Sequence, residues 1–152
     1  MKPNYLIIPL VVLLVAVAGS YFTGTGMAWY KTINLPTWAP NGAFIGTVWT
    51  IIFILSAIAT ILVWNGSRGP AFKWIIGLLI LNGLLNIFWC FLFFNLHLFG
   101  WSIVEMIILE ATVIAPIILI WPSSQPAALL FLPYAVWVPF ATYLAISVWR
   151  LN

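Results

Sequence analysis

Charged residues are nearly missing from this chain of 152 residues. Only 5% of its residues are Asp, Glu, Lys or Arg, whereas a soluble domain carries about 25%. Hydrophobic residues make up 65% of the chain and aromatic residues 17%. So few charges cannot cover a water-facing surface. The composition therefore excludes a soluble globular domain and predicts a polytopic membrane protein.

Residues that commonly carry chemistry are equally scarce. A single cysteine, Cys90, excludes an internal disulfide, and the only histidine is His97. His97 falls in the short connection "NLHLFG", where we expect an exposed loop residue rather than an axial haem ligand. The sequence contains no Cys-x-x-Cys pair, no Ser/His/Asp set and no glycine-rich phosphate loop. It therefore offers no machinery for conventional catalysis, and we expect no metal site and no nucleic-acid partner.

Five long apolar runs are present instead. They cover roughly residues 5–22, 43–64, 73–94, 101–121 and 127–149. Each approaches or exceeds the about 20 residues that a helix needs to cross a bilayer. Because lipid tolerates no unpaired backbone groups, each run is expected to be a helix. The sequence thus predicts an all-α membrane protein, a bundle of five transmembrane helices with a structured first loop, in one domain over 1–152.

The basic residues bias the orientation of this bundle slightly. With five spans, Lys2, Arg68 and Lys73 share one side, and Lys31 and Arg150 share the other. The positive-inside rule then places the N-terminus in the cytoplasm by three residues to two. The run "LIIPLVVLLVAVAG" after Lys2 also resembles a signal peptide, but the four later spans require membrane insertion without it.

The ten tryptophans fall into two groups. One group lies near span ends, where indole rings favour the headgroup region; its members are Trp64, Trp74, Trp101, Trp121 and Trp149. The other group lies inside the spans or in the long connection between the first two spans. It comprises Trp29, Trp38, Trp49, Trp89 and Trp137. The membrane interface does not account for this second group.

Three spans each place aromatic and mildly polar residues on one helical face. These stripes are Trp49, Phe53, Ser56 and Thr60; Asn82, Asn86, Trp89 and Phe93; and Tyr134, Trp137, Ala141 and Leu144. An amide in hydrocarbon is costly unless it is paired. The stripes therefore either hold helices together or line a ligand cavity. In the fifth span Pro133 and Pro139 are expected to bend the helix.

Both acidic residues lie in the fourth span. Glu105 is one turn inside it and is expected to reach the interface. Glu110 lies nearer the middle, where an ionised carboxylate costs about 2.5–3.5 kcal/mol, so we expect it to be protonated, paired or facing a wet cavity. Five positions turn a helix by about 140°. The two acids therefore do not share a face, and acid/base catalysis by a carboxylate pair is not expected.

Three segments occur in an order that is typical of one family. They are "WYKTINLPTWAPNGAFIGTVWT", "LLNIFWCFLFF" followed by "GWSIVE", and "LLFLPYAVWVPFATYLAISVWRLN". Over nearly its whole length the chain resembles the TspO/MBR family of tryptophan-rich sensory proteins and translocator proteins. The resemblance implies a five-helix bundle that binds porphyrins such as protoporphyrin IX beneath the first loop, and a homodimer. The ligand-binding residues that it implies are Trp29, Tyr30, Trp38, Trp49, Phe53, Asn86, Trp89, Trp137, Ala141 and Leu144.

The chain departs from the family pattern at several positions. Ala145 stands where the last helix commonly has asparagine, and Ile146 and Ser147 occupy the sterol-associated tyrosine positions, which argues against sterol binding. Around Gly77, Leu81 interrupts a small-xxx-small stripe, which weakens the dimer inference for that helix. Ala39 precedes Pro40 where the family has two prolines.

Three functions remain open, in this order. The first is a membrane receptor or translocator that binds tetrapyrroles and acts in porphyrin trafficking, sensing or stress response, with no cofactor required. The second is an enzyme that degrades porphyrin with light and oxygen, its chemistry belonging to the photosensitising ligand. The third is a small proton-coupled transporter of another hydrophobic ligand, with Glu110 as the proton site.

Overall fold

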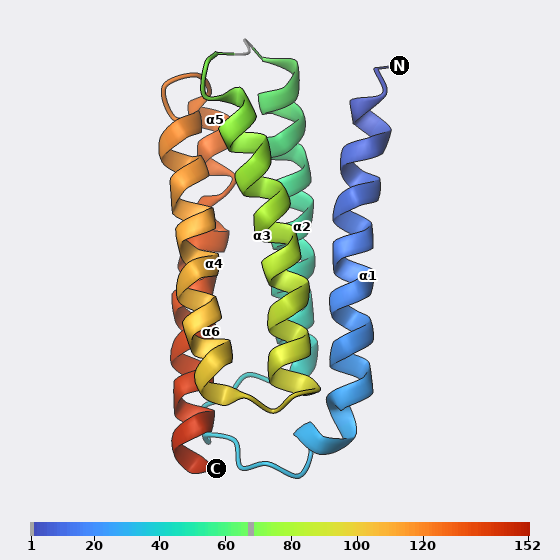
Figure 1. Ribbon diagram of the computed structural model, residues 1–152, viewed down its shortest axis with the longest axis vertical. Coiled ribbons are helices and arrows are strands. Elements are labelled where there is room, and N and C mark those ends of the chain that lie inside the picture. The colour runs from blue at the N-terminus through green and yellow to red at the C-terminus, as the bar shows by residue number, and fades with distance from the viewer. Residues whose placement is uncertain (1, 67–68) are drawn as a thin grey trace.

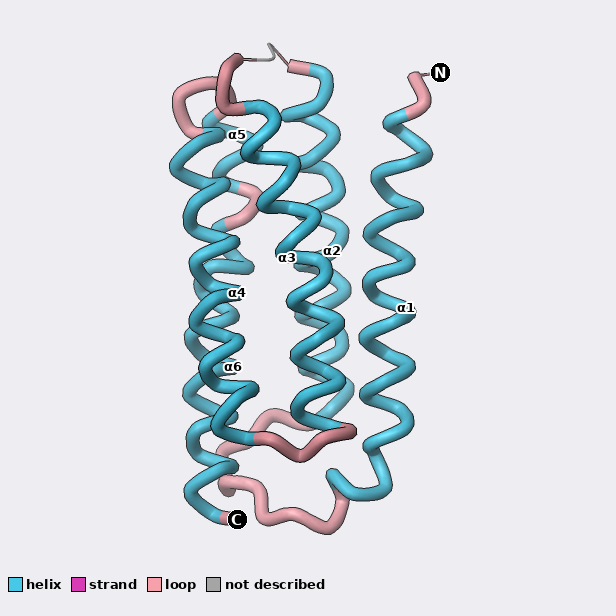
Figure 2. The backbone as a smooth tube through the Cα atoms, viewed as in Figure 1, coloured by secondary structure: helices cyan, strands magenta, loops and turns pink. Residues whose placement is uncertain are grey.

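The computed structural model describes residues 2–66 and 69–152, and this part of the chain is helical apart from short connections (Figures 1 and 2). The helices are α1 (Asn4–Tyr30), α2 (Gly42–Asn65), α3 (Phe72–Phe94), α4 (Phe99–Ile120), α5 (Gln125–Leu129) and α6 (Leu132–Leu151). Arg68, which contributes to the predicted charge bias, lies outside the described residues.

Five segments are long and apolar enough to cross a bilayer. The helices α1 to α4 supply one each, and α5 together with α6 supplies the fifth, Gln125–Leu151. The predicted all-α membrane fold is confirmed. The bundle places the N-terminus at one end, beside the connection from α2 to α3, and the C-terminus at the other end, beside residues 31–41 (Figure 1).

The first helix is longer than the sequence predicted. It continues through "TGTGMAWY" to Tyr30 rather than ending near residue 22. This added part of α1 packs on the end of α3: Asn95 is hydrogen-bonded to Phe22 and Thr25, and a Cβ atom at Gly26 would lie 2.1 Å from the carbonyl oxygen of Phe94. Glycine weakens a helix by about 1 kcal/mol per residue, but at Gly26 it also permits this close approach. The first connection is therefore reduced to residues 31–41.

The fifth span is interrupted near its start. The short helix α5 ends at Leu129 and α6 begins at Leu132, with Pro133 in its first turn. Proline fits this position because the first turn of a helix leaves its N–H groups unpaired. Pro133 therefore marks the beginning of a helix instead of bending one. Pro139 lies in the interior of α6, so the bend that the sequence predicted there stays a prediction.

The helices close into a ring whose order differs from the order in the chain. The helix α1 packs against both α2 and α3, α3 packs against α4, and α4 packs against α6 and α5. Contact between α5 and α2 completes the ring. The inward faces of α2, α3, α4 and α6 can therefore meet in one interior.

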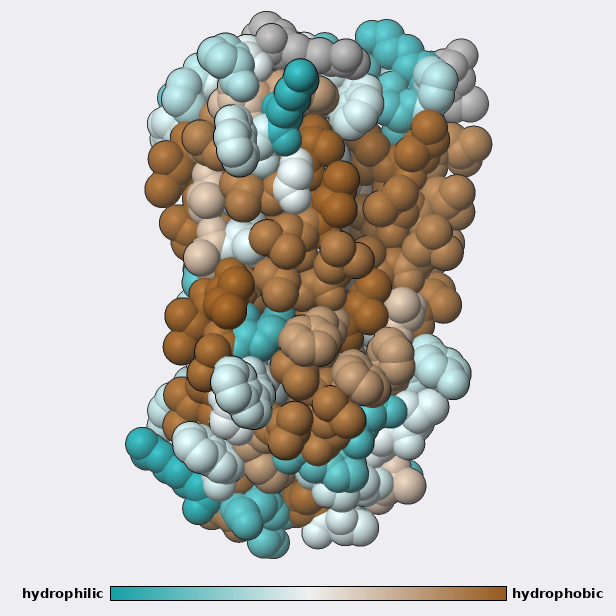
Figure 3. All heavy atoms as spheres, viewed as in Figure 1, coloured by the Kyte–Doolittle hydropathy of each residue, from teal (hydrophilic) through white to brown (hydrophobic). Residues whose placement is uncertain are grey.

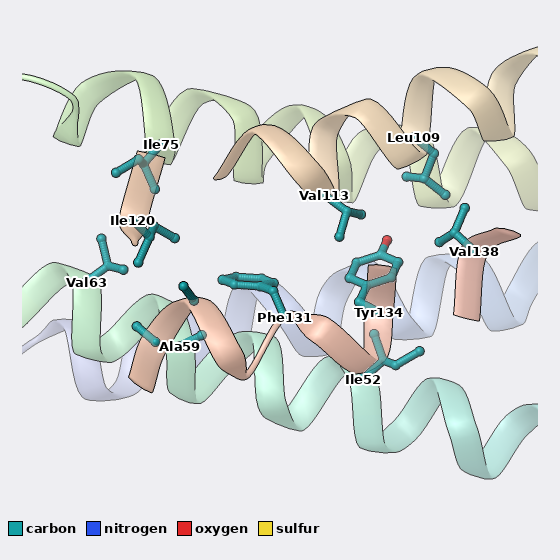
Figure 4. Close-up of a cluster of buried hydrophobic side chains, with 12 residues drawn as sticks. Ile52, Ala59, Val63, Ile75, Leu109, Val113, Ile120, Phe131, Tyr134 and Val138 are labelled. Carbon is teal, nitrogen blue, oxygen red and sulfur yellow. The ribbon is translucent and has the colours of Figure 1, made fainter. Parts of the chain in front are cut away.

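Two buried clusters fill this interior. The larger one runs from the α5 end to the middle of the bundle, where Phe131, directly before α6, and Tyr134 of α6 project among aliphatic side chains such as Ile52 and Val113 (Figure 4). The second lies toward residues 31–41 and consists of Phe93, Phe94, Met106, Ala145 and Val148. Aromatic rings are thus concentrated in the half of the bundle that faces the first connection.

The outer surface suits a bilayer. Hydrophobic residues form a broad brown band around the middle of the molecule, and paler and teal residues gather toward both ends (Figure 3). Trp74, Trp101 and Trp149 are 74%, 67% and 53% exposed near the ends of their helices. Indole rings at these positions match the depth of lipid headgroups.

Candidate ligand site

A polar network crosses the middle of the bundle between α3, α4 and α6. The Asn82 amide nitrogen donates to Thr112 Oγ1 at 2.9 Å, and the Tyr134 hydroxyl donates to Asn82 Oδ1 at 3.0 Å. The Asn86 amide nitrogen donates to the same Tyr134 hydroxyl. All four residues are buried. Of the two roles predicted for the α3 stripe, holding helices together or lining a cavity, the structure shows the first, because Asn82 and Asn86 both bond side chains of other helices.

Next to this network lies a first group of aromatic residues, on α2 and α6. The Trp49 ring packs at 5.7 Å from Phe53 and also at 5.7 Å from Tyr134, edge-on to the latter. The Trp137 ring lies 6.3 Å from Phe44 and 5.1 Å from Phe140. Within the described residues the buried Trp137 Nε1 has no hydrogen-bond partner. This group therefore offers large ring surface and an unused N–H donor.

A second aromatic group joins α1, α3 and the connection from α3 to α4. The Trp29 ring stacks on His97 at 3.8 Å, and the Trp89 ring stacks on Phe93 at 5.1 Å. The Tyr30 ring lies 5.4 Å from Phe94. His97 is exposed in its loop, as the sequence predicted. Ala141 and Leu144 of α6 pack against the same cluster.

The connection 31–41 lies across this end of the bundle and is fastened at both ends. The backbone N–H of Asn34 donates to Asn152 Oδ1 at 2.9 Å, and Asn152 Nδ2 donates to the Asn34 carbonyl at 3.0 Å. The Trp38 ring stacks on Tyr143 of α6 at 5.2 Å. At its far end, Asn41 caps α2 by accepting the backbone N–H of Phe44 at 2.8 Å.

The neighbouring end of α1 is also tied to the bundle. Asn95 Nδ2 donates to the Phe22 carbonyl at 2.8 Å, and the Thr25 hydroxyl donates to Asn95 Oδ1 at 2.9 Å. Gly26 lies one turn further along, at the close approach to α3. These contacts hold Trp29 and Tyr30 in place, because both residues lie in the last turn of α1.

The residues that the sequence nominated for a ligand site divide into three sets in the structure. Trp49, Phe53 and Trp137 belong to the first aromatic group, and Trp29, Tyr30, Trp89, Ala141 and Leu144 belong to the second. Asn86 is part of the central network, and Trp38 lies on α6 from outside, 43% exposed. The two aromatic groups lie on the side of the central network that faces the connection 31–41, whereas Asn86 belongs to the network and Trp38 to the connection itself. The contact of all these residues with a ligand stays a prediction.

The two acidic residues behave differently from each other. Glu105 is 4% exposed and does not reach the interface, contrary to expectation, because it continues the buried face of α4 formed by Ser102 and Leu109. Neither of its carboxylate oxygens has a hydrogen-bond partner among the described residues. Glu110 is half-buried, and its Oε2 is equally unpartnered in the described part of the chain.

Several residues of this end were missed by sequence reasoning. Phe44, Phe140 and Tyr143 contact the nominated tryptophans, and Asn34 with Asn152 fastens the connection. Phe140 could have been found, because it follows Trp137 by three positions on the same helix. The Asn34–Asn152 pair could not, since 118 positions separate its members.

Comparison with known proteins places this architecture in a family. The model of the TspO/MBR family matches residues 7–150. The chain belongs to the TspO/MBR family. Among its relatives is the tryptophan-rich protein TspO of Archaeoglobus fulgidus, 34% identical over 150 residues, which cover 94% of this chain and 93% of the relative.

Two further relatives of the TspO/MBR family come from human and from a bacterium. The human translocator protein is 31% identical over 137 residues, covering 88% of this chain and 81% of its own. The protein CrtK of Rhodobacter capsulatus is 31% identical over 127 residues, covering 82% and 79% respectively. The chain is thus an integral, multi-pass membrane protein of the TspO/MBR family.

Proposed function

We propose that this protein is a membrane receptor or translocator that binds tetrapyrroles of the protoporphyrin IX type. The proposed site lies between the central polar network and the connection 31–41. Family membership supports the receptor or translocator role, because the relatives include translocator proteins. The ligand itself is argued from the side chains.

The observation that carries the proposal is that indole rings from separate elements gather in two neighbouring aromatic groups and in the connection beside them. Trp29 comes from α1, Trp49 from α2, Trp89 from α3 and Trp137 from α6, and Trp38 comes from the connection. A porphyrin is a flat, apolar macrocycle, and such rings gain most from offset or edge contacts with indoles.

The ends of the site suit the two ends of a porphyrin. Toward the middle of the bundle, the amides of Asn82 and Asn86 and the hydroxyl of Tyr134 are engaged with one another. This side of the site therefore offers apolar contact to the macrocycle. Toward the water, Lys31 is exposed directly after α1 and is the cation we assign to a propionate group.

The test is a titration of protoporphyrin IX into the purified protein in detergent, in the dark, followed by the absorbance of the porphyrin. Absorbance is chosen because tryptophan substitutions change the protein's own fluorescence. Trp49→Phe and Trp137→Phe should each weaken binding about two- to tenfold, since an aromatic contact contributes about 0.5–1.5 kcal/mol. Trp74→Phe is the matched control, because Trp74 is 74% exposed on the outer surface.

The proposal fails if binding does not saturate, or if Trp74→Phe weakens it as much as the other two substitutions do. Repeating the titration under light then separates binding from degradation. A bound porphyrin that survives illumination as long as porphyrin in detergent alone indicates a receptor. A loss of absorbance that is faster in the protein and depends on Trp49 or Trp137 indicates the enzyme instead.

A further inference from the structure

A hollow lies at the opposite end of the molecule from the connection 31–41. It measures about 550 Å³ and separates the beginning of α1 from the end of α2. The residues that define its character are Lys2, Asn4, Ile7, Ile8, Trp64 and Asn65. The helix ends that form it are at the same end of the bundle in Figure 1. None of these residues takes part in the tetrapyrrole site.

The mouth of this hollow is polar and positively charged. Lys2 is exposed there, and both acidic residues of the sequence lie far away on α4. Asn4 is only 6% exposed, yet its amide nitrogen has no hydrogen-bond partner among the described residues. A buried amide without an acceptor lowers stability. The mouth therefore offers the exposed ammonium group of Lys2 and the unpartnered amide of Asn4. A ligand that is both an anion and a hydrogen-bond acceptor would suit these two groups.

The floor of the hollow is apolar. Ile7 and Ile8 line it from α1, and Ile7 is 55% exposed. Ile8 and Asn4 are the buried residues in the first half of α1, so the hollow lies where this helix turns one side toward the end of α2. Trp64 on the rim marks the depth at which a bilayer changes from hydrocarbon to headgroups.

We propose that this hollow binds one anionic glycerophospholipid. Its phosphate accepts hydrogen bonds from the Lys2 ammonium group and the Asn4 amide, and one acyl chain lies over Ile7 and Ile8 between α1 and α2. Basic pockets between transmembrane helices are suited to anionic headgroups. A glycerophospholipid supplies both the phosphate for the mouth and an acyl chain for the apolar floor. The site is distinct from the tetrapyrrole site and does not depend on it.

The test is native mass spectrometry of the delipidated protein with added phosphatidylglycerol or phosphatidylcholine of the same acyl chains. Phosphatidylglycerol should bind more tightly to one site by about fivefold or more, the effect of one basic residue near an anionic headgroup. Lys2→Gln should remove most of that preference. Lys31→Gln is the matched control, because Lys31 is an exposed lysine at the other end of the same helix.

Thermal unfolding of Asn4→Leu gives an independent readout. Without lipid, this variant should melt at a higher temperature than the unsubstituted protein, because a buried unpaired amide is gone. With phosphatidylglycerol, its gain in melting temperature should be smaller. Equal binding of the two lipids overturns the proposal. So does an effect of Lys31→Gln as large as that of Lys2→Gln, and so does competition by millimolar inorganic phosphate, which would mean a simple anion site.

Discussion

The two ends of this bundle differ in how many contacts join their helices and connections. At the end that carries residues 31–41, side chains from distant parts of the chain fasten one another, as in the Asn34–Asn152 pair and the Trp29–His97 stack. At the other end, α1 stands beside a hollow and leaves a buried amide of Asn4 without a partner among the described residues. One end is held by the protein alone, and the other is suited to being completed by lipid.

The largest expected effect comes from loosening the fastened end. Gly26→Ala places a methyl group where a Cβ lies 2.1 Å from the Phe94 carbonyl oxygen. Backbone cannot move aside cheaply, so we expect a loss of about 2–3 kcal/mol in the free energy of unfolding. Unfolding in detergent with increasing denaturant measures it. The control is Gly24→Ala, where a Cβ meets nothing within 4 Å; this variant should gain up to about 1 kcal/mol.

A smaller loss of stability is expected at the polar network in the middle of the bundle. Tyr134→Phe removes the hydroxyl that joins Asn82 and Asn86 and leaves both amides with a missing partner. We expect about 1–2 kcal/mol of destabilisation, since interhelical hydrogen bonds in membranes are modest. The comparison is Tyr143→Phe, which keeps its stacking on Trp38 and loses only an exposed hydroxyl. Equal melting temperatures for the two variants would contradict a structural role for the network.

The smallest effect on stability, and the most local one, is expected at the connection. Asn152→Ala removes two hydrogen bonds to Asn34 at an exposed position, which should lower stability by less than about 1 kcal/mol. Backbone amides of residues 31–41 should nevertheless exchange hydrogen faster, which exchange mass spectrometry of this segment detects. Asn65→Ala is the control, because its side chain donates only to Ile61 within its own helix. Unchanged exchange in Asn152→Ala would mean that the remaining contacts, Trp38 on Tyr143 and the Asn34 side chain donating to the Leu151 carbonyl, are enough to hold the connection.

Helical periodicity explains what the sequence could predict. The stripe from Asn82 to Phe93 repeats at helical spacing, and the structure turns Asn82, Asn86 and Phe93 inward. The five spans followed equally from composition and length. These features depend only on the order of residues along one helix, and that order can be read from a single sequence.

Features that depend on pairs of helices were not predictable in this way. The extension of α1 to Tyr30 depends on how close Phe94 lies to Gly26. The burial of Glu105 depends on which face of α4 turns inward. Its position one turn inside the span had predicted instead that its side chain reaches the interface. A hollow such as the one beside Asn4 is set by the angle between α1 and α2, and no local pattern encodes that angle.

The close approach at Gly26 also has a mechanical consequence. The first helix has 27 residues, so it is about 40 Å long, and its contacts with Phe94 and Asn95 lie near one end only. Further along, Val15 lies against Gly83 of α3 and Gly19 lies against Cys90, so α1 follows α3 over several turns. When bilayer thickness changes, the two helices are therefore expected to tilt together. Their common tilt would leave the spacing between Gly26 and Phe94, and with it the neighbouring rings, unchanged.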